Sequence, residues 1–308
     1  MPGHSLANRV VLVAGATRGA GRAIAVEAAR SGAFVYATGR SSRREGPSEM
    51  ERPETIEETG DLIEAAGGRG EALVVDHLDQ AAVRDLVDQI RSDRGRLDVL
   101  VNDIFGGDRY AQWGTPLWEH DLAGGLRMLR MGIETHLLTT TLAMPLLLET
   151  GDALLVEVTD GTSEVNAVRR PGVGFYYDLV KATVDRIVTG LADETAALPV
   201  TALGVTPGWL RSEQMLDGFG VTEATWRDAC AQEPGFAISE SPTYVARGLV
   251  ALAADPDHGR FAGQVLTARQ LAETYDVTDT DGSRPDCWGL IAEHGWSEDS
   301  PEVIAGFR

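Results

Sequence analysis

Residues 10–25 read VVLVAGATRGAGRAIA and constrain the fold of this chain more than any other stretch. The β-branched, apolar run predicts a buried strand, and the Ala-rich sequence after it has helical spacing. Gly15, Gly19 and Gly21 lie between the two, where the backbone must turn tightly and approach a ligand. The helix would direct free N–H groups and its positive dipole end at this turn. This order predicts a cradle for a dinucleotide pyrophosphate, although close packing in any α/β domain would also use such glycines.

Length and composition bound the class of protein. With 308 residues, 43% of them hydrophobic, the chain can bury the core of one α/β domain. No apolar run approaches the ~20 residues that span a bilayer, and residues 1–5 lack the layout of a signal peptide. Cys230 and Cys287 lie far apart without metal-ligand spacing, so we expect a reducing, cytoplasmic setting and no metal. A net charge of −20 argues against nucleic acid or anionic membranes as partners, since both would repel the chain.

Strand and helix patterns alternate along the rest of the chain. Further strands are predicted at 33–38, 72–76, 97–102, 154–158, 200–205 and 263–267. Helices are predicted at about 54–66, from Asp79 as N-cap to residue 90, and over 116–149 with a break at Gly124 and Gly125. This alternation predicts an α/β fold, a Rossmann-type doubly wound parallel sheet of about seven strands with helices on both faces.

The end of the second strand indicates which nucleotide would bind. In NAD-specific folds of this type an acidic side chain there holds the ribose 2′-hydroxyl, but no Asp or Glu follows this strand. Arg40 stands there instead, and Arg18 in the glycine turn could approach from the other side. Two guanidinium groups suit a 2′-phosphate, so the sequence predicts NADP(H) as cofactor. Arg43 and Arg44 are interpreted as a solvated loop.

Tyr177 and Lys181 are four residues apart in a predicted helix and therefore share one face. Free tyrosine titrates near ~10, and a neighbouring ammonium would lower the pKa of Tyr177 and make it an acid/base at neutral pH. Tyr176 is out of register with the lysine. Such a pair also occurs by chance in many helices, so its meaning depends on the motifs around it.

Together these motifs resemble the short-chain dehydrogenase/reductase family over roughly residues 6–268. The resemblance rests on the glycine turn, the stretch Asn102-Asp103-Ile104-Phe105-Gly106, the Tyr-x-x-x-Lys pair and the turn Pro207-Gly208. The Asn102 variant and the tail 271–282 resemble the subgroup related to dehydrogenase/reductase family member 1. The resemblance implies hydride transfer between NADP(H) and a carbonyl or alcohol, with Tyr177 as general acid/base and Lys181 orienting the ribose. It also implies a small-molecule substrate and a homo-oligomer.

The same resemblance implies a set of cofactor contacts. Asp76 and His77 would lie at the adenine, and Ser212 would replace a threonine of the family. The full set is Gly15, Thr17, Arg18, Gly19, Ala20, Gly21, Arg40, Asp76, His77, Asn102, Tyr177, Lys181, Pro207, Gly208, Leu210 and Ser212.

The chain departs from the family pattern at the catalytic centre. Gly132 stands where the family has an Asn that holds a water serving the lysine; His136, one turn on, is either a substitute or a buried structural histidine. Counted from the fifth strand, Asp160 occupies the position of the family's substrate-binding Ser. Counted back from Tyr177, Ser163 has that spacing.

Asp160 allows three interpretations. An ionised carboxylate only accepts hydrogen bonds and would oppose an oxyanion on a substrate carbonyl. Asp160 could donate if a raised pKa kept it protonated, or the hydroxyl of Ser163, Thr159 or Thr162 could replace it. The third interpretation is a substrate that is cationic at the reacting carbon, such as an iminium. We favour the first two.

We expect residues 1–308 to form one domain. The segment 209–238, rich in aromatic residues, predicts a lid over the substrate, and residues 268–308 form a C-terminal extension. Alternatives to the carbonyl oxidoreductase are an enzyme of the same fold without net redox, such as a dehydratase or epimerase, and a non-catalytic NADP(H) sensor or scaffold. The retained pair Tyr177 and Lys181 favours an enzyme.

Overall fold

The computed structural model describes residues 5–170 and 172–308, so the N-terminal expectation for residues 1–4 lies outside the described residues. Its centre is a seven-stranded sheet in the order β3-β2-β1-β4-β5-β6-β7, and every adjacent pair is parallel. The strands are β1 (Val10–Ala14), β2 (Phe34–Gly39), β3 (Arg69–Val74), β4 (Val99–Asn102), β5 (Ala153–Val158), β6 (Val200–Thr206) and β7 (Val265–Thr267). The strand order reverses between β1 and β4. The predicted doubly wound sheet is confirmed.

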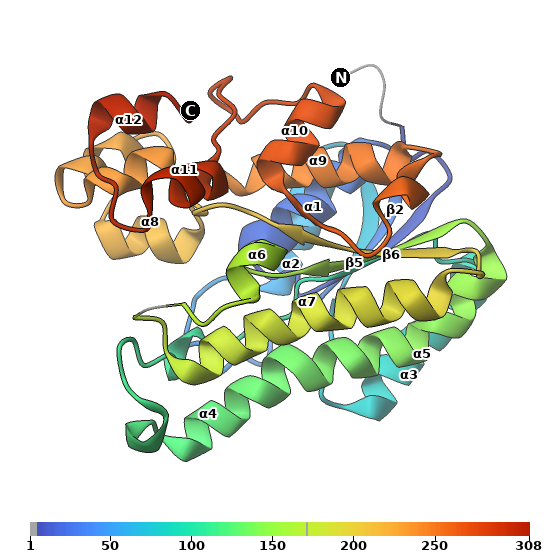
Figure 1. The fold of residues 1–308 in the computed structure, drawn as a ribbon. Helices are drawn as coiled ribbons and strands as arrows, with labels where there is room; N and C mark the ends of the chain where they lie inside the picture. The colour runs from blue at the N-terminus through green and yellow to red at the C-terminus, as the bar shows by residue number, and fades with distance from the viewer. Residues whose placement is uncertain (1–4, 171) are drawn as a thin grey trace.

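Helices cover both faces of the sheet (Figure 1). They are α1 (Gly19–Arg30), α2 (Ile56–Ala65), α3 (Gln80–Arg94), α4 (Leu122–Leu129), α5 (Thr135–Thr150), α6 (Ser163–Asn166), α7 (Phe175–Thr195), α8 (Glu213–Phe219), α9 (Pro242–Ala254), α10 (Ala268–Tyr275), α11 (Cys287–His294) and α12 (Pro301–Ala305). One face packs against α1, α9 and α10, and the other against α3, α5 and α7. Alternation along β1 supplies both cores, since Val11 and Val13 enter one and Val10 and Leu12 the other.

The predicted helix break at Gly124 and Gly125 is wrong, because both glycines lie inside α4. A Cβ built on Gly125 would lie 2.2 Å from Cε2 of Tyr176, so this glycine allows α4 to pack closely on α7. The irregular turn lies further on, in the π-helix η3 (Arg130–Glu134), which contains Gly132 and joins α4 to α5. The glycine pair therefore reports tertiary packing rather than a helix end.

Two other boundaries differ from the prediction. The third strand ends at Val74, so Asp76 and His77 lie in the loop beyond it. Asp79 caps α3 as predicted, its carboxylate accepting from the N–H groups of Ala81 and Ala82, but the helix continues to Arg94. It stops at Gly95, where the backbone is left-handed at φ 68°.

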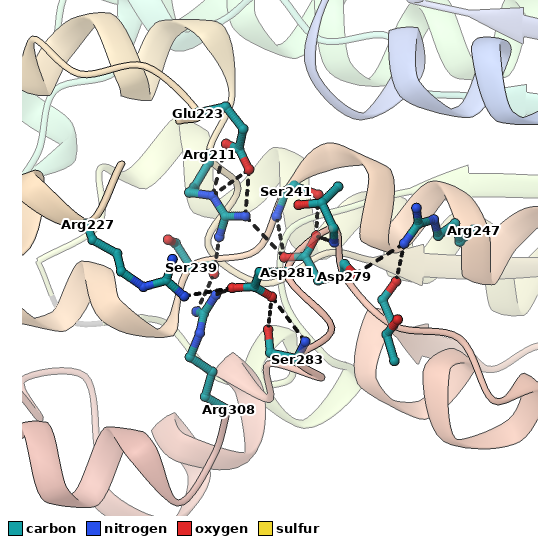
Figure 2. A network of polar contacts seen from close by, with 12 residues as sticks. Arg211, Glu223, Arg227, Ser239, Ser241, Arg247, Asp279, Asp281, Ser283 and Arg308 are labelled. Atoms are coloured by element: carbon teal, nitrogen blue, oxygen red, sulfur yellow. Dashed lines mark hydrogen bonds and ion pairs between the residues drawn. The ribbon is translucent and has the colours of Figure 1, made fainter. Parts of the chain in front are cut away.

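The 209–238 segment contains short helices, α8, η4 (Trp226–Ala231) and η5 (Pro234–Ile238), and packs beside α11 and α12 at one end of the molecule (Figure 1). Figure 2 shows the polar network that joins this segment to the C-terminal extension. The buried Arg211 guanidinium donates to the Ser239 carbonyl at 2.6 Å and to Asp279 at 3.2 Å. Arg308 donates to the same carbonyl and to Asp281. The extension is therefore a structural support of the segment.

Within residues 5–170 and 172–308, no helix is both long enough and apolar enough to cross a membrane.

Candidate functional site

A cavity of about 830 Å³ opens at the carboxyl ends of the strands, where ligands bind in open α/β sheets. It extends from the glycine turn past α7 to the 209–238 segment and the C-terminal extension. The predicted site residues that line it are Gly15, Thr17, Arg18, Gly19, Ala20, Arg40, Asp76, His77, Asp160, Tyr177, Lys181, Pro207, Gly208, Leu210 and Ser212. Gly21, Asn102 and Ser163 do not line it.

The glycine turn has the shape of an anion cradle. Gly15 has φ +91°, and a Cβ there would lie 2.3 Å from the Asp103 carbonyl oxygen. Gly21 packs inward, because a Cβ would lie 2.3 Å from the Gly15 oxygen. A Cβ on Gly19 would point into open space, with the Cβ of Ser212 as its nearest neighbour at 3.9 Å. The open side leads to the N-terminus of α1, which suits the pyrophosphate of a dinucleotide.

An acidic side chain already lies at this helix N-terminus. The Glu213 carboxylate accepts a hydrogen bond from the Gly19 N–H at 2.8 Å and another from Arg22 at 3.3 Å. It comes from the first turn of α8, directly after Ser212, which caps that helix. Sequence reasoning missed Glu213, because only the fold brings residue 213 to residue 19.

Arg18 and Arg40 both line the cavity, but of the two only Arg40 is paired with a carboxylate in the described part of the chain. The Arg18 guanidinium forms no hydrogen bond or ion pair within the described residues, and burial lowers its pKa. Arg40 donates to Glu49 at 3.0 Å, and Arg127 and Tyr110 bind the same carboxylate. Since one carboxylate faces two arginines, this cluster keeps an excess of positive charge.

Tyr177 and Lys181 point into the cavity from α7, with Asp160 beside them. The Tyr177 hydroxyl donates to Oδ2 of Asp160 at 3.0 Å, and Arg170 donates to the same oxygen at 3.1 Å. The Arg170 side chain is only 3% exposed, and its Nε also donates to Asp178 at 3.0 Å. Sequence reasoning missed Arg170, which lies in the irregular stretch between α6 and α7.

The expected lowering of the tyrosine pKa is wrong for this arrangement. Burial, then the neighbouring Asp160 and Asp108, raise the pKa of Tyr177 well above its ordinary value. The Lys181 ammonium lies 3.8 Å from the centre of the Phe105 ring and 5.4 Å from that of Tyr177, and burial lowers its pKa. Burial and the two carboxylates therefore outweigh the cation of Arg170, which acts in the opposite direction, and Tyr177 is a protonated phenol at neutral pH.

None of the three candidate hydroxyls replaces Asp160. Ser163 donates to Asp185 at 2.8 Å on the side of α7, away from the cavity. The Thr159 hydroxyl donates to the Lys181 carbonyl at 3.0 Å, and that of Thr162 caps α6. The ion pair with Arg170 equally argues against a protonated Asp160. The structure leaves a carboxylate next to Tyr177.

The predicted cofactor contact of Asn102 also differs. Its amide nitrogen donates to Thr140 and Glu157, each at 2.9 Å, inside the protein. Asp103 and Phe105, which follow it, line the cavity instead.

Gly132 and His136 occupy one wall of the cavity. A Cβ on Gly132 would lie 2.4 Å from Cγ1 of Val180, which leaves no room for an Asn. His136 bonds through Nδ1 to buried Glu157 and through Nε2 to the Ile104 carbonyl at 2.9 Å. Burial opposes the charged imidazole, but Glu157 raises the pKa of His136 overall. His136 is thus a buried, paired histidine at the cavity wall.

The residues expected at the adenine are placed differently from each other. Asp76 accepts from the Leu78 N–H at 2.9 Å at the cavity edge. His77 is buried between the hydroxyls of Thr38 and Thr139, at 2.8 Å each, and burial lowers its pKa to about 3. It is therefore a neutral imidazole.

The C-terminal extension forms a cavity wall that sequence reasoning did not predict. The Trp288 indole donates to the Pro207 carbonyl at 2.8 Å, and a Cβ on Gly208 would lie 2.6 Å from the Cys287 Cβ. Trp296 packs edge-on against Trp288 and also lines the cavity. The two tryptophans of the extension were the available signal in the sequence.

Across the described ranges, 5–170 and 172–308, no group of three or more His, Cys, Asp or Glu side chains is placed to hold a metal ion.

Comparisons with known proteins fit this geometry. Residues 9–218 match the family model of the short chain dehydrogenases. The chain is 30% identical to Dehydrogenase/reductase SDR family member 1 of Mus musculus over 279 residues, covering 89% of this chain and 84% of that protein. Its counterpart from Homo sapiens is 27% identical over 285 residues, with the same coverage.

Solved structures show the same fold. A short chain dehydrogenase from Salmonella enterica serovar Typhi aligns with TM-score 0.68 at 21% identity, covering 87% of this chain and 99% of that one. A candidate short chain dehydrogenase from Shigella flexneri 2a, complexed with NADP, aligns with TM-score 0.67 at 21% identity, covering 86% and 99%. By its matched residues and its similarity to these relatives, the chain belongs to the short-chain dehydrogenase/reductase family and resembles dehydrogenase/reductase SDR family member 1.

Proposed function

We propose that the protein is an NADP(H)-dependent oxidoreductase that transfers a hydride between the nicotinamide and a carbonyl or alcohol carbon. The observation that carries this proposal is the single cavity that joins the glycine cradle, Arg18 and Arg40 to Tyr177 and Lys181. Family membership supports the oxidoreductase class, and the NADP complex of the Shigella flexneri protein supports the nucleotide.

The cofactor would lie along the carboxyl ends of the strands. The N–H groups at the start of α1 would hold the pyrophosphate in place of the Glu213 carboxylate that now accepts the Gly19 N–H, and Asp76 would lie at the adenosine. Arg18, which has no partner in the described residues, and Arg40 would hold a 2′-phosphate. When bound, the reduced nicotinamide supplies a hydride to the substrate carbon.

Tyr177 would provide the proton. Its phenol lines the cavity and carries the proton that a general acid donates in the direction of reduction, and that transfer would require its raised pKa to fall when the cofactor and substrate bind. Lys181 would bind the nicotinamide ribose hydroxyls from the same helix face. The net charge of −20 argues against nucleic acid as a partner, and the cavity suits a small-molecule substrate.

Assays of turnover, NADPH consumption and NADPH binding distinguish the proposed oxidoreductase from an enzyme without net redox and from a non-catalytic sensor. Tyr177→Phe should lose most turnover of carbonyl substrates, by about 10²–10⁴-fold, while NADPH still binds with unchanged affinity in calorimetry. Product formation without net NADPH consumption would identify a dehydratase or epimerase. Tight NADPH binding without turnover of any carbonyl, alcohol or imine would identify a sensor or scaffold.

A further inference from the structure

The group beside the reacting end of the cavity is an ion pair rather than a hydroxyl. The Asp160 side chain is 36% exposed and faces the cavity, while its partner Arg170 is 3% exposed. Arg170 is itself held by Asp178 at 3.0 Å, so the fold fixes a carboxylate where a neutral donor is usual. The Tyr177 hydroxyl donates to that carboxylate at 3.0 Å.

A carbonyl substrate is poorly served by this arrangement. Reduction of a carbonyl develops negative charge on oxygen, and a site stabilises that charge with hydrogen-bond donors. The hydroxyls of Ser163, Thr159 and Thr162 are bound elsewhere. A carboxylate that shares the tyrosine hydroxyl would repel the developing alkoxide.

Other groups around Tyr177 also favour positive charge. Asp108 lines the same end of the cavity, and Glu233, Glu298 and Asp299 line the region formed by the 209–238 segment and the extension. The Phe105 and Trp113 rings lie 5.7 and 5.2 Å from that of Tyr177, and the Phe105 ring holds a cation, the Lys181 ammonium at 3.8 Å from its centre. The walls near the extension are apolar, with Trp209, Trp288 and Trp296.

We propose that the preferred substrate is the nitrogen counterpart of a ketone, an apolar cyclic or aryl imine that binds as its protonated iminium ion. This inference rests on the proposed function, because it uses the same cofactor and the same cavity. Asp160 accepts the iminium N–H and keeps the nitrogen protonated, which makes the carbon electrophilic.

The step balances without a proton from the enzyme. A hydride from the reduced nicotinamide forms a new C–H bond at the iminium carbon, and the electron pair of the C=N π bond moves to nitrogen. The iminium is thereby reduced to a neutral secondary amine, and the nicotinamide is oxidised. The released amine takes its further proton from water, and Tyr177 acts here as a positioning residue that orients Asp160.

The test compares matched imine and ketone probes. We expect NADPH-dependent reduction of 1-methyl-3,4-dihydroisoquinoline with kcat/KM at least tenfold above that of 1-tetralone. Calorimetry in the presence of NADP⁺ gives a readout besides turnover. The ammonium form of 1-methyl-1,2,3,4-tetrahydroisoquinoline should bind at least tenfold tighter than its neutral oxygen isostere, 1-methylisochroman.

Substitution at residue 160 supplies the matched variants. Asp160→Ser should invert the preference, raising 1-tetralone reduction and lowering imine reduction at least tenfold, and an inversion cannot come from general damage to the fold. Asp160→Asn should remove the preference for the ammonium while leaving NADPH affinity unchanged. A wild-type preference for 1-tetralone, or equal binding of the ammonium and the isochroman, would overturn the inference but not the proposed function. Failure to bind NADPH would overturn both.

Discussion

Glu213 and Gly19 meet at the N-terminus of α1, where the carboxylate accepts the Gly19 N–H at 2.8 Å. This N–H belongs to the set that a helix start offers to a phosphate. A side chain of α8 therefore lies where the cofactor pyrophosphate is expected, and Arg22 at 3.3 Å secures it. The contact therefore connects the proposed pyrophosphate site to the 209–238 segment.

The first prediction concerns that competition. Glu213→Gln should tighten NADPH binding about five- to tenfold, because it removes the negative charge that competes for the helix N-terminus, an effect of about 1 kcal/mol. Isothermal titration calorimetry measures it. Asp217→Asn on the same helix, where the carboxylate pairs with Arg52 away from Gly19, is the control and should leave the affinity unchanged. Weaker binding by Glu213→Gln would show that Glu213 supports the cofactor instead of competing with it.

A second prediction concerns the missing asparagine of the family. Gly132→Ala should lower the free energy of unfolding by about 1–3 kcal/mol, since its Cβ would lie 2.4 Å from Cγ1 of Val180. The double variant with Val180→Ala should regain part of that loss, because the shortened side chain makes room. Chemical denaturation of the single and double variants measures both. Additive losses in the double variant would exclude this contact as the cause.

The sequence predicted the sheet, and it predicted a glycine turn and a Tyr-Lys pair that both line the cavity, because these features depend on local pattern. The strand, the glycine turn and the helix of residues 10–25 are adjacent in the chain, and Tyr177 and Lys181 share a helix face by spacing alone. The predicted helix break at Gly124 and Gly125 was wrong. A glycine that allows close packing against Tyr176 of another helix cannot be distinguished in sequence from one that ends a helix.

The substrate end could not be predicted in the same way. Arg170 lies ten residues after Asp160 and donates to it at 3.1 Å, a contact that no spacing rule predicts. Trp288 of the extension donates to the carbonyl of Pro207, which lies 81 residues earlier in the chain. Contacts between distant segments decided the electrostatics of Tyr177, so the predicted direction of its pKa shift was wrong.

A third prediction concerns pH and stability. Glu240 is buried beside Gly208, and burial raises its pKa to about 8. The folded state thus holds a proton that the unfolded state releases near its ordinary pKa, so stability falls as the pH rises from about 4.5 towards 8. The slope contributed by this group is at most about 1.4 kcal/mol per pH unit. Glu240→Gln should flatten the dependence of the unfolding temperature on pH between 5 and 8. An equal slope in both proteins would refute this assignment.

A fourth prediction tests the network of Figure 2. Asp279→Asn should cost about 1.5–3 kcal/mol, because the buried guanidinium of Arg211 loses its fully buried partner at 3.2 Å and keeps only the half-exposed Glu223 carboxylate at 2.8 Å. Asp281→Asn, at a partly exposed carboxylate in the same network, should cost only about 1 kcal/mol. Thermal unfolding of both variants gives the comparison, and similar losses for the two would contradict the assigned role of Asp279.

The central claim is that this cavity binds NADP(H) through the glycine cradle and the two arginines at its rim. Calorimetric titration of the purified protein with NADPH and, separately, NADH tests it most directly, with Arg40→Ala as the variant. We expect NADPH to bind more tightly than NADH, and Arg40→Ala to weaken NADPH binding at least tenfold while changing NADH binding little. Equal losses for the two nucleotides would remove the 2′-phosphate assignment, and absence of binding by either would contradict the account as a whole.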